Sequence, residues 1–227
     1  MQIQYFLAEG MRIGLLSLHE LLQSPAEACL SLLPDSSHAR VLRYRQNADR
    51  IRTLFAEVLS RQMLAEALEA AAPLQHPESF ASHLQALSPG GLLYAEEPPG
   101  KHLHILRDPY GKPYLEGTPV HFSLSHAGPW AACAVAKVPC GVDVETTAVD
   151  PEVAEHFFAP GEASADASER LRLWTLKEAL CKCRCLPLEE SLKTPVSAFP
   201  SLRLVVFSLQ LPDGAWLSGI MDQPSKR

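Results

Sequence analysis

Two hydrophobic periodicities divide the chain into helical and extended segments. Within residues 50–64 the apolar side chains recur every three to four positions, which predicts an amphipathic helix whose buried face consists of Ile51, Leu54, Phe55, Val58 and Leu59. Asp49 stands directly before this run and is expected to cap the helix. We expect the opposite face to carry the charged residues Arg52, Glu57 and Arg61.

Alternating apolar and polar residues indicate strands. The opening "MQIQYFLAEGMRIG" predicts a first strand, and "VHFSLSH", "WAACAVAK" and "GVDVE" predict three more within residues 120–147. "HLHILRD" followed by "PYGKPYLEG" predicts a short strand and a turn-rich strand entry. Near the end, "LRLVVFSLQL" and "AWLSGIM" predict a strand pair joined at "PDG".

The intervening segments complete the pattern. Residues 150–168 are rich in Ala, Asp and Glu, and we expect a loop there that leads into a helix over residues 168–184. Pro and Gly frame residues 73–100, which we interpret as an inserted connecting region with a short helix from Ser79 to Leu87. Strands and helices do not alternate regularly, so their order favours an α+β fold.

Composition narrows the class of protein. The net charge of −6 opposes general affinity for nucleic acid or an anionic membrane. No apolar run approaches bilayer length and no apolar leader is visible at the start, so we expect a cytoplasmic protein. Six cysteines in 227 residues do not indicate a disulfide scaffold. In "CKCRC" only Cys181 and Cys185 share a helix face, which favours free thiols over metal binding.

The segment "GVDVE" concentrates negative charge. On a strand, Asp143 and Glu145 point to one face, and such a pair fits a solvated strand edge. The small apolar residues upstream instead favour an interior strand, where two bare carboxylates are costly. A divalent cation would compensate them, and carboxylate oxygens suit Mg²⁺.

The segment "WTLKEALCK" supplies a third acid. Glu178 and Lys182 are four residues apart and share one helix face, with Trp174 one turn earlier. The simplest interpretation is a weak surface salt bridge beside a core tryptophan. In the alternative, Glu178 joins Asp143 and Glu145 in a metal site and Lys182 holds a phosphate, an arrangement suited to phosphoryl transfer.

Two turns add groups that can donate to a phosphate. "FSLSHAG" places Ser125 and His126 at the end of a strand, and "YGKP" places Lys112 on a turn. Each is also compatible with a purely structural histidine or an exposed turn lysine.

In this order, "YGKPYL", "FSLSHAGPW", "GVDVE" and "WTLKEALCK" resemble the motifs of the 4′-phosphopantetheinyl transferase superfamily, in particular its longer, two-repeat, surfactin-synthetase-activating type. The resemblance implies a Mg²⁺ cofactor held by Asp143, Glu145 and Glu178. It also implies catalytic roles for Glu178 and for Lys182, which would contact the pyrophosphate of coenzyme A. The remaining coenzyme A contacts would come from Arg40, Arg52, Lys112, Ser125 and His126.

The resemblance further implies a fold and a reaction. Two similar α/β halves, residues 1–118 and 119–227, would pack about a pseudo-twofold axis with the site in the cleft between them. The reaction would transfer 4′-phosphopantetheine from coenzyme A to a serine of an acyl or peptidyl carrier protein. We expect a monomer, with Arg170, Arg172 and Arg184 as candidates for carrier docking.

Two other functions stay open at this stage. A non-catalytic relative would bind coenzyme A or a carrier protein without transfer, although it would not need the carboxylate trio. A Mg²⁺-dependent nuclease would also use three carboxylates, but the negative net charge and the lack of an extended basic stripe disfavour it.

Overall fold

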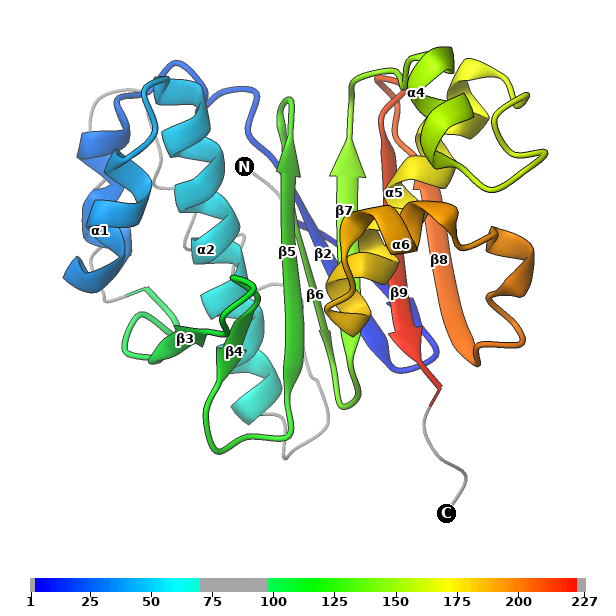
Figure 1. The fold of residues 1–227 in the computed structure, drawn as a ribbon. Coiled ribbons are helices and arrows are strands. Elements are labelled where there is room, and N and C mark those ends of the chain that lie inside the picture. Colours follow the sequence, from blue (N-terminus) through cyan, green and yellow to red (C-terminus); the bar gives the residue numbers. More distant parts are fainter. Residues whose placement is uncertain (1–2, 70–97, 224–227) are drawn as a thin grey trace.

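The computed structural model describes residues 3–69 and 98–223, which form an α+β fold. Two antiparallel sheets lie between two long helices (Figure 1). The helix α2 (Asn47–Glu69) packs on the first sheet, and α5 (Ala167–Arg184) packs on the second. The short helix expected from Ser79 to Leu87 lies outside the described residues.

The first sheet has the strand order β1-β2-β6-β5, and all its neighbours are antiparallel. Its strands are β1 (Ile3–Ala8), β2 (Met11–Ser17), β5 (His121–Ala127) and β6 (Trp130–Ala136). The opening segment, expected as one strand, is therefore a hairpin. Because the sheet takes strands from both sides of residue 118, the expected boundary at that residue does not coincide with the division between sheets.

The second sheet has the order β7-β9-β8 and is also antiparallel. Its strands are β7 (Cys140–Glu145), β8 (Leu204–Gln210) and β9 (Trp216–Asp222), which confirms the strand predictions for "GVDVE" and for the last pair. A separate small hairpin joins β3 (Ile105–Arg107) to β4 (Pro113–Leu115), also as predicted.

Alternation along the strands separates the core from the functional face. The apolar core between the sheets contains Ile13 and Leu15 of β2 together with Val142 and Val144 of β7. Successive side chains of a strand point to opposite faces. Asp143 therefore points away from this core, on the face of β7 against which α5 packs.

Gly141 sets the distance between α5 and β7. A Cβ atom built on Gly141 would lie 2.0 Å from the carbonyl oxygen of Ala179 and 2.6 Å from the amide nitrogen of Cys183. Only glycine permits this approach of helix to strand. Since Asp143 shares a strand face with Gly141, the same contact brings the last turns of α5 next to that carboxylate.

Two expectations for α2 are wrong. The helix begins at Asn47, so Asp49 lies in its first turn and does not cap it. Glu57 and Arg61, expected on the solvent face, are only 4% and 3% exposed. They are covered because Ser37 of α1 (Asp35–Leu42) donates to Glu57, and because Arg61 donates to carbonyls of residues 100–103.

The helix expected over residues 168–184 is confirmed by α5. The loop expected over residues 150–168 is wrong in part, because it contains α4 (Pro151–Phe157), whose first turn is capped by Asp150 accepting from the Glu152 amide at 2.8 Å. Further short helices that the pattern did not predict are η1 (Ala26–Leu32), α6 (Leu188–Lys193) and η2 (Val196–Ala198). Within the described ranges, no helix combines the length and the apolarity that crossing a bilayer requires.

Candidate functional site

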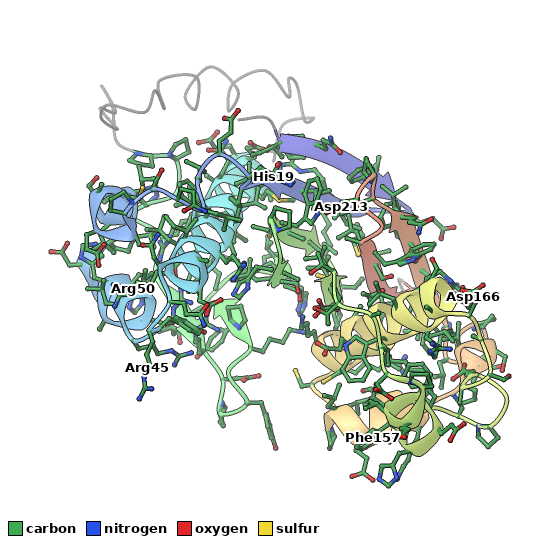
Figure 2. The ribbon with its side chains drawn as sticks, turned by 90° about the horizontal axis from the view of Figure 1, so that it is seen from above. His19, Arg45, Arg50, Phe157, Asp166 and Asp213 are labelled. Carbon is green, nitrogen blue, oxygen red and sulfur yellow. The ribbon has the colours of Figure 1, made fainter. Side chains whose placement is uncertain are left out.

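A cleft of about 880 Å³ gathers most of the residues that the sequence singled out. Figure 2 shows the two flanks of the molecule, with Arg45 and Arg50 on the side of α1 and α2, and Phe157 and Asp166 on the side of α4 and α5. The predicted residues on the cleft lining are Arg40, Lys112, Ser125, His126, Asp143, Glu145, Glu178 and Lys182.

At the centre of the cleft, Lys182 binds Asp143. The Lys182 Nζ lies 2.6 Å from Asp143 Oδ1, which also accepts a hydrogen bond of 2.6 Å from Ser125 Oγ. Lys182 Nζ donates to the same hydroxyl at 3.2 Å. An ammonium, a hydroxyl and a carboxylate from three elements, α5, β5 and β7, thus form one compact cluster.

Serine side chains join β5 to β7. The alternation of "FSLSH" puts Ser123 and Ser125 on one face of β5. Ser123 Oγ accepts a hydrogen bond of 3.1 Å from the Val142 amide, while Ser125 Oγ reaches Asp143. These contacts connect strands that belong to different sheets and fix Asp143 relative to β5.

Glu178 lies beside this cluster with its Oε2 3.7 Å from Lys182 Nζ. Burial and the neighbouring charge of Asp143 raise the pKa of Glu178. Burial also raises the pKa of Asp143, although Lys182 and Ser125 oppose the shift. Burial disfavours charge on Lys182, but the two carboxylates outweigh it and raise the pKa of the ammonium. The two acids therefore repel each other and share one cation.

Glu145 does not complete a preformed ligand cluster. Its Oε1 accepts from the amides of Thr146 and Thr147 at 2.6 and 2.8 Å, so the carboxylate turns back on its own chain. Nowhere in the described part of the chain do three His, Cys, Asp or Glu side chains gather closely enough to hold a metal as they stand. The donor chemistry nevertheless suits a hard cation, because Asp143, Glu145 and Glu178 line one cleft and offer it carboxylate oxygens.

The predicted nucleotide contacts fall into different environments. Lys112 Nζ donates to the carbonyl of Cys183 at 3.1 Å, which ties the β3–β4 hairpin to α5. His126 is half-buried and its pKa is lowered, chiefly by burial. Arg52 does not line the cleft; its guanidinium donates to the Gly128 carbonyl and to Asp49, both at 2.6 Å. Arg40 lines the cleft but is paired with Glu57.

Sequence reasoning missed further cationic groups in the cleft. Arg43 and Arg107 line it together with Arg40. Burial and then the charges of Arg107 and Arg43 lower the pKa of Arg40 to about 10. Guanidinium groups this close to one another favour an anionic ligand. The run of basic residues in "HARVLRYR" is a local signal that could have identified Arg43. No local pattern indicates that Arg107 lies near it in the fold.

Lys177, the first of the two lysines in "WTLKEALCK", has a different role from Lys182. It is fully buried, and its Nζ donates to the carbonyls of Leu192 and Thr194 at 2.7 and 2.6 Å. It also forms an ion pair of 2.7 Å with Glu162. Lys177 thus anchors α5 to α6 and does not line the cleft.

The arginines considered for carrier docking bind within the chain. Arg184 pairs with Asp222 at 2.9 Å, and Arg172 pairs with Glu169 at 2.5 Å. Arg170 donates to the Val149 carbonyl at 3.3 Å. Arg184 and Arg170 thus join α5 to other parts of the chain, whereas the Arg172 pair lies within α5.

Comparison with known proteins agrees with the motifs. A family model described as the 4′-phosphopantetheinyl transferase superfamily matches residues 139–213, the segment that contains Asp143, Glu145, Glu178 and Lys182. A 4′-phosphopantetheinyl transferase of Bacillus subtilis is 35% identical over 118 residues, which cover 46% of this chain and 50% of the relative. The transferase Sfp of Bacillus subtilis strain 168 is 35% identical over 117 residues, with the same coverage. The transferase gsp of Aneurinibacillus migulanus is 28% identical over 110 residues, 44% of each chain. The chain therefore spans about half the length of the relatives it matches.

Proposed function

We propose that this chain, a member of the 4′-phosphopantetheinyl transferase superfamily, transfers the 4′-phosphopantetheine group of coenzyme A to a serine of an acyl or peptidyl carrier protein. The observation that carries the proposal is the meeting of Asp143, Glu178 and Lys182 in one cleft that also holds Arg40, Arg43 and Arg107. The lysine with its two carboxylates and the group of three arginines suit a ligand with separated phosphates.

Asp143, Glu145 and Glu178 would hold the divalent cation that the resemblance implies. Mg²⁺ bound there would stabilise negative charge on the pyrophosphate oxygens of coenzyme A. For Glu145 to take part, its carboxylate must leave the amides of Thr146 and Thr147. At the same time the ion pair between Asp143 Oδ1 and Lys182 Nζ must lengthen, so that the carboxylate oxygen can bind the cation.

Glu178 is the proposed general base. The serine hydroxyl of the carrier attacks the β-phosphorus, the bond to the bridging oxygen breaks, and adenosine 3′,5′-bisphosphate leaves. Glu178 accepts the proton of the attacking hydroxyl. Lys182 neutralises charge on the leaving side.

The nucleotide would lie in the same cleft. We assign Arg40, Lys112, Ser125 and His126 to contacts with its phosphates and ring system. Arg52 would contribute indirectly, because it holds the turn at Gly128 through a hydrogen bond to the Gly128 carbonyl. The two proposed halves of the molecule would meet at this cleft. We also propose that the protein acts as a monomer in the cytoplasm.

Incubation of an apo carrier protein with the chain, coenzyme A and Mg²⁺, followed by intact-mass measurement of the carrier, tests the proposal. We expect one phosphopantetheine group on the carrier serine with the wild-type chain and none with Glu178→Gln. Glu189→Gln is the matched control, because Glu189 also forms an i,i+4 pair with a lysine, at 2.5 Å, but lies outside the cleft. Coenzyme A binding without any transfer by the wild-type chain would favour the non-catalytic alternative instead.

A further inference from the structure

Two cysteines lie on the wall of the cleft, one helical turn apart. The amide of Cys185 donates to the carbonyl of Cys181, and both side chains line the cleft beside Glu178 and Lys182. Cys185 is exposed and Cys181 is half-buried. Coenzyme A, the ligand proposed for this cleft, ends in a thiol. Its oxidised form is a disulfide, which could react with a cysteine thiol that lines the cleft.

The other cysteines are poorly placed for reaction. Cys29, Cys133, Cys140 and Cys183 are all buried. Burial raises the pKa of Cys29 to about 11 and that of Cys140 to about 12. Since the thiolate is the nucleophile in disulfide exchange, these thiols react slowly. Cys185 is the thiol that a dissolved disulfide reaches first.

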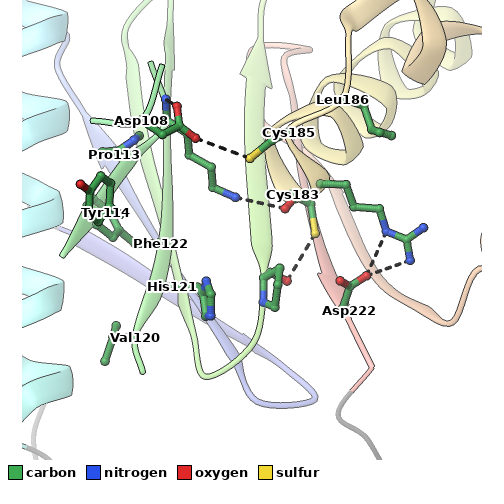
Figure 3. Close-up of a pocket in the computed structure, with 13 residues that line it drawn as sticks. Asp108, Pro113, Tyr114, Val120, His121, Phe122, Cys183, Cys185, Leu186 and Asp222 are labelled. Atoms are coloured by element: carbon green, nitrogen blue, oxygen red, sulfur yellow. Dashed lines mark hydrogen bonds and ion pairs between the residues drawn. The ribbon is translucent and has the colours of Figure 1, made fainter. Parts of the chain in front are cut away.

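Cys185 stands where the cleft meets a second hollow of about 610 Å³. Figure 3 shows its side chain at the end of α5 facing Asp108, with 3.9 Å between Sγ and Oδ2. Lys112 also lines both hollows. The Cys185 thiol therefore borders both hollows, within reach of a ligand that occupies either one.

We infer that Cys185 is a thiol–disulfide exchange site for disulfides of coenzyme A, an inference that rests on the proposed function. The Cys185 thiol gives its proton to solvent, and its thiolate attacks one sulfur of the coenzyme A disulfide. A disulfide forms between Cys185 and one coenzyme A, the original sulfur–sulfur bond breaks, and the second coenzyme A leaves as a thiolate that takes up a proton. The coenzyme A disulfide is the oxidant, and no other is needed.

Cys181 is a weak resolving thiol for this adduct. Its Sγ donates to the Leu186 carbonyl at 3.0 Å, and burial raises its pKa. The mixed disulfide therefore persists at neutral pH, and its nucleotide part occupies the cleft. Carrier modification should stop until a dithiol reductant releases the adduct.

The reduced full chain, freed of reductant, is treated with coenzyme A disulfide or with glutathione disulfide at equal concentration. Intact-mass measurement and peptide mapping follow the products. We expect one coenzyme A adduct, on Cys185, forming at least about tenfold faster than the glutathione adduct, because binding in the cleft raises the local concentration of the disulfide. Adenosine 3′,5′-bisphosphate should slow only the coenzyme A reaction.

Two variants locate the reaction. Cys185→Ser should lose the adduct, and Cys181→Ser should keep it. Equal rates with the two disulfides, or an adduct on any other cysteine, would overturn the inference. Carrier modification by the reduced chain is measured in parallel, with each variant's own reduced rate as its reference. If transfer proceeds while Cys185 shows no preference, the inference fails and the proposed function stands; if transfer also fails, the proposed function falls with it.

Discussion

Lys182 Nζ lies 2.6 Å from the Oδ1 of Asp143, a carboxylate whose side chain is only 6% exposed. The pair joins the last turns of α5 to the middle of β7, and 39 residues separate its members. It is closer than the pair that Lys182 makes with Glu178 one helical turn away, at 3.7 Å. The lysine is thus the cation that compensates this buried acid.

Lys182→Met should destabilise the chain, because it leaves Asp143 buried without a counter-charge. We expect the free energy of unfolding to fall by about 2 kcal/mol, below the range for fully buried pairs because Lys182 is partly exposed. Urea unfolding in the presence of a chelator measures the change. Asp143→Asn combined with Lys182→Met should recover more than half of the loss; equal losses in the single and double variants would show that the pair is not coupled.

Glu178→Gln should stabilise the metal-free chain while it abolishes transfer. The pKa of Glu178 is raised in the folded state, so its ionised form opposes folding at neutral pH. We expect a gain of about 0.5–1 kcal/mol. The gain should be full above the raised pKa and should vanish as the pH falls toward about 4.3, the ordinary value for glutamate. A gain independent of pH, or a loss at neutral pH, would contradict this account of the site.

Gly141→Ala tests the approach of α5 to β7. The added methyl would lie 2.0 Å from the backbone oxygen of Ala179, so the helix must move. We expect a loss of about 3 kcal/mol in unfolding free energy. Gly14→Ala is the matched control on β2, because its nearest contact is the flexible Met63 side chain at 2.6 Å, which can turn aside. Thermal unfolding of both variants measures their losses of stability. Equal losses in Gly141→Ala and Gly14→Ala would show that Gly141 has no special role in the approach of α5 to β7.

Arg107→Gln should weaken coenzyme A binding with little effect on the chemical step. Loss of one charge-assisted contact to a phosphate is worth about 1.5–3 kcal/mol. We therefore expect KM for coenzyme A to rise by roughly tenfold or more while kcat changes little. Arg45→Gln, an exposed arginine that does not line the cleft, is the control and should leave both constants unchanged. A fall in kcat at constant KM would remove Arg107 from the proposed phosphate contacts.

Local patterns predicted the elements that carry the site. The alternation of "VHFSLSH" and "GVDVE" and the helix over "WTLKEALCK" needed only neighbouring residues to be recognised. The partner of Lys182 was harder to predict from the sequence. The i,i+4 spacing indicates Glu178, whereas the closer contact to Asp143 arises from the packing of α5 on β7. That packing depends on Gly141, whose missing side chain gives no pattern of its own.

Other differences have equally physical causes. Glu57 and Arg61 look solvent-exposed on a helical projection, yet Ser37 and residues 100–103 cover them and satisfy their charges. Such polar contacts join segments far apart in the sequence, so no local pattern predicts them. The helix α4 had a local signature, since an Asp cap followed by Pro151 is a favoured helix start, but the acidic and alanine-rich composition masked it.

Binding of Mn²⁺, a paramagnetic substitute for Mg²⁺, tests the central claim most directly. Electron paramagnetic resonance titration in the presence of coenzyme A should show one ion per chain, with affinity reduced at least about tenfold in Asp143→Asn and in Glu178→Gln and unchanged in Glu189→Gln. If Asp143→Asn and Glu178→Gln bound Mn²⁺ as tightly as the wild-type chain does, these carboxylates would not form the metal site, and the proposed mechanism would be wrong.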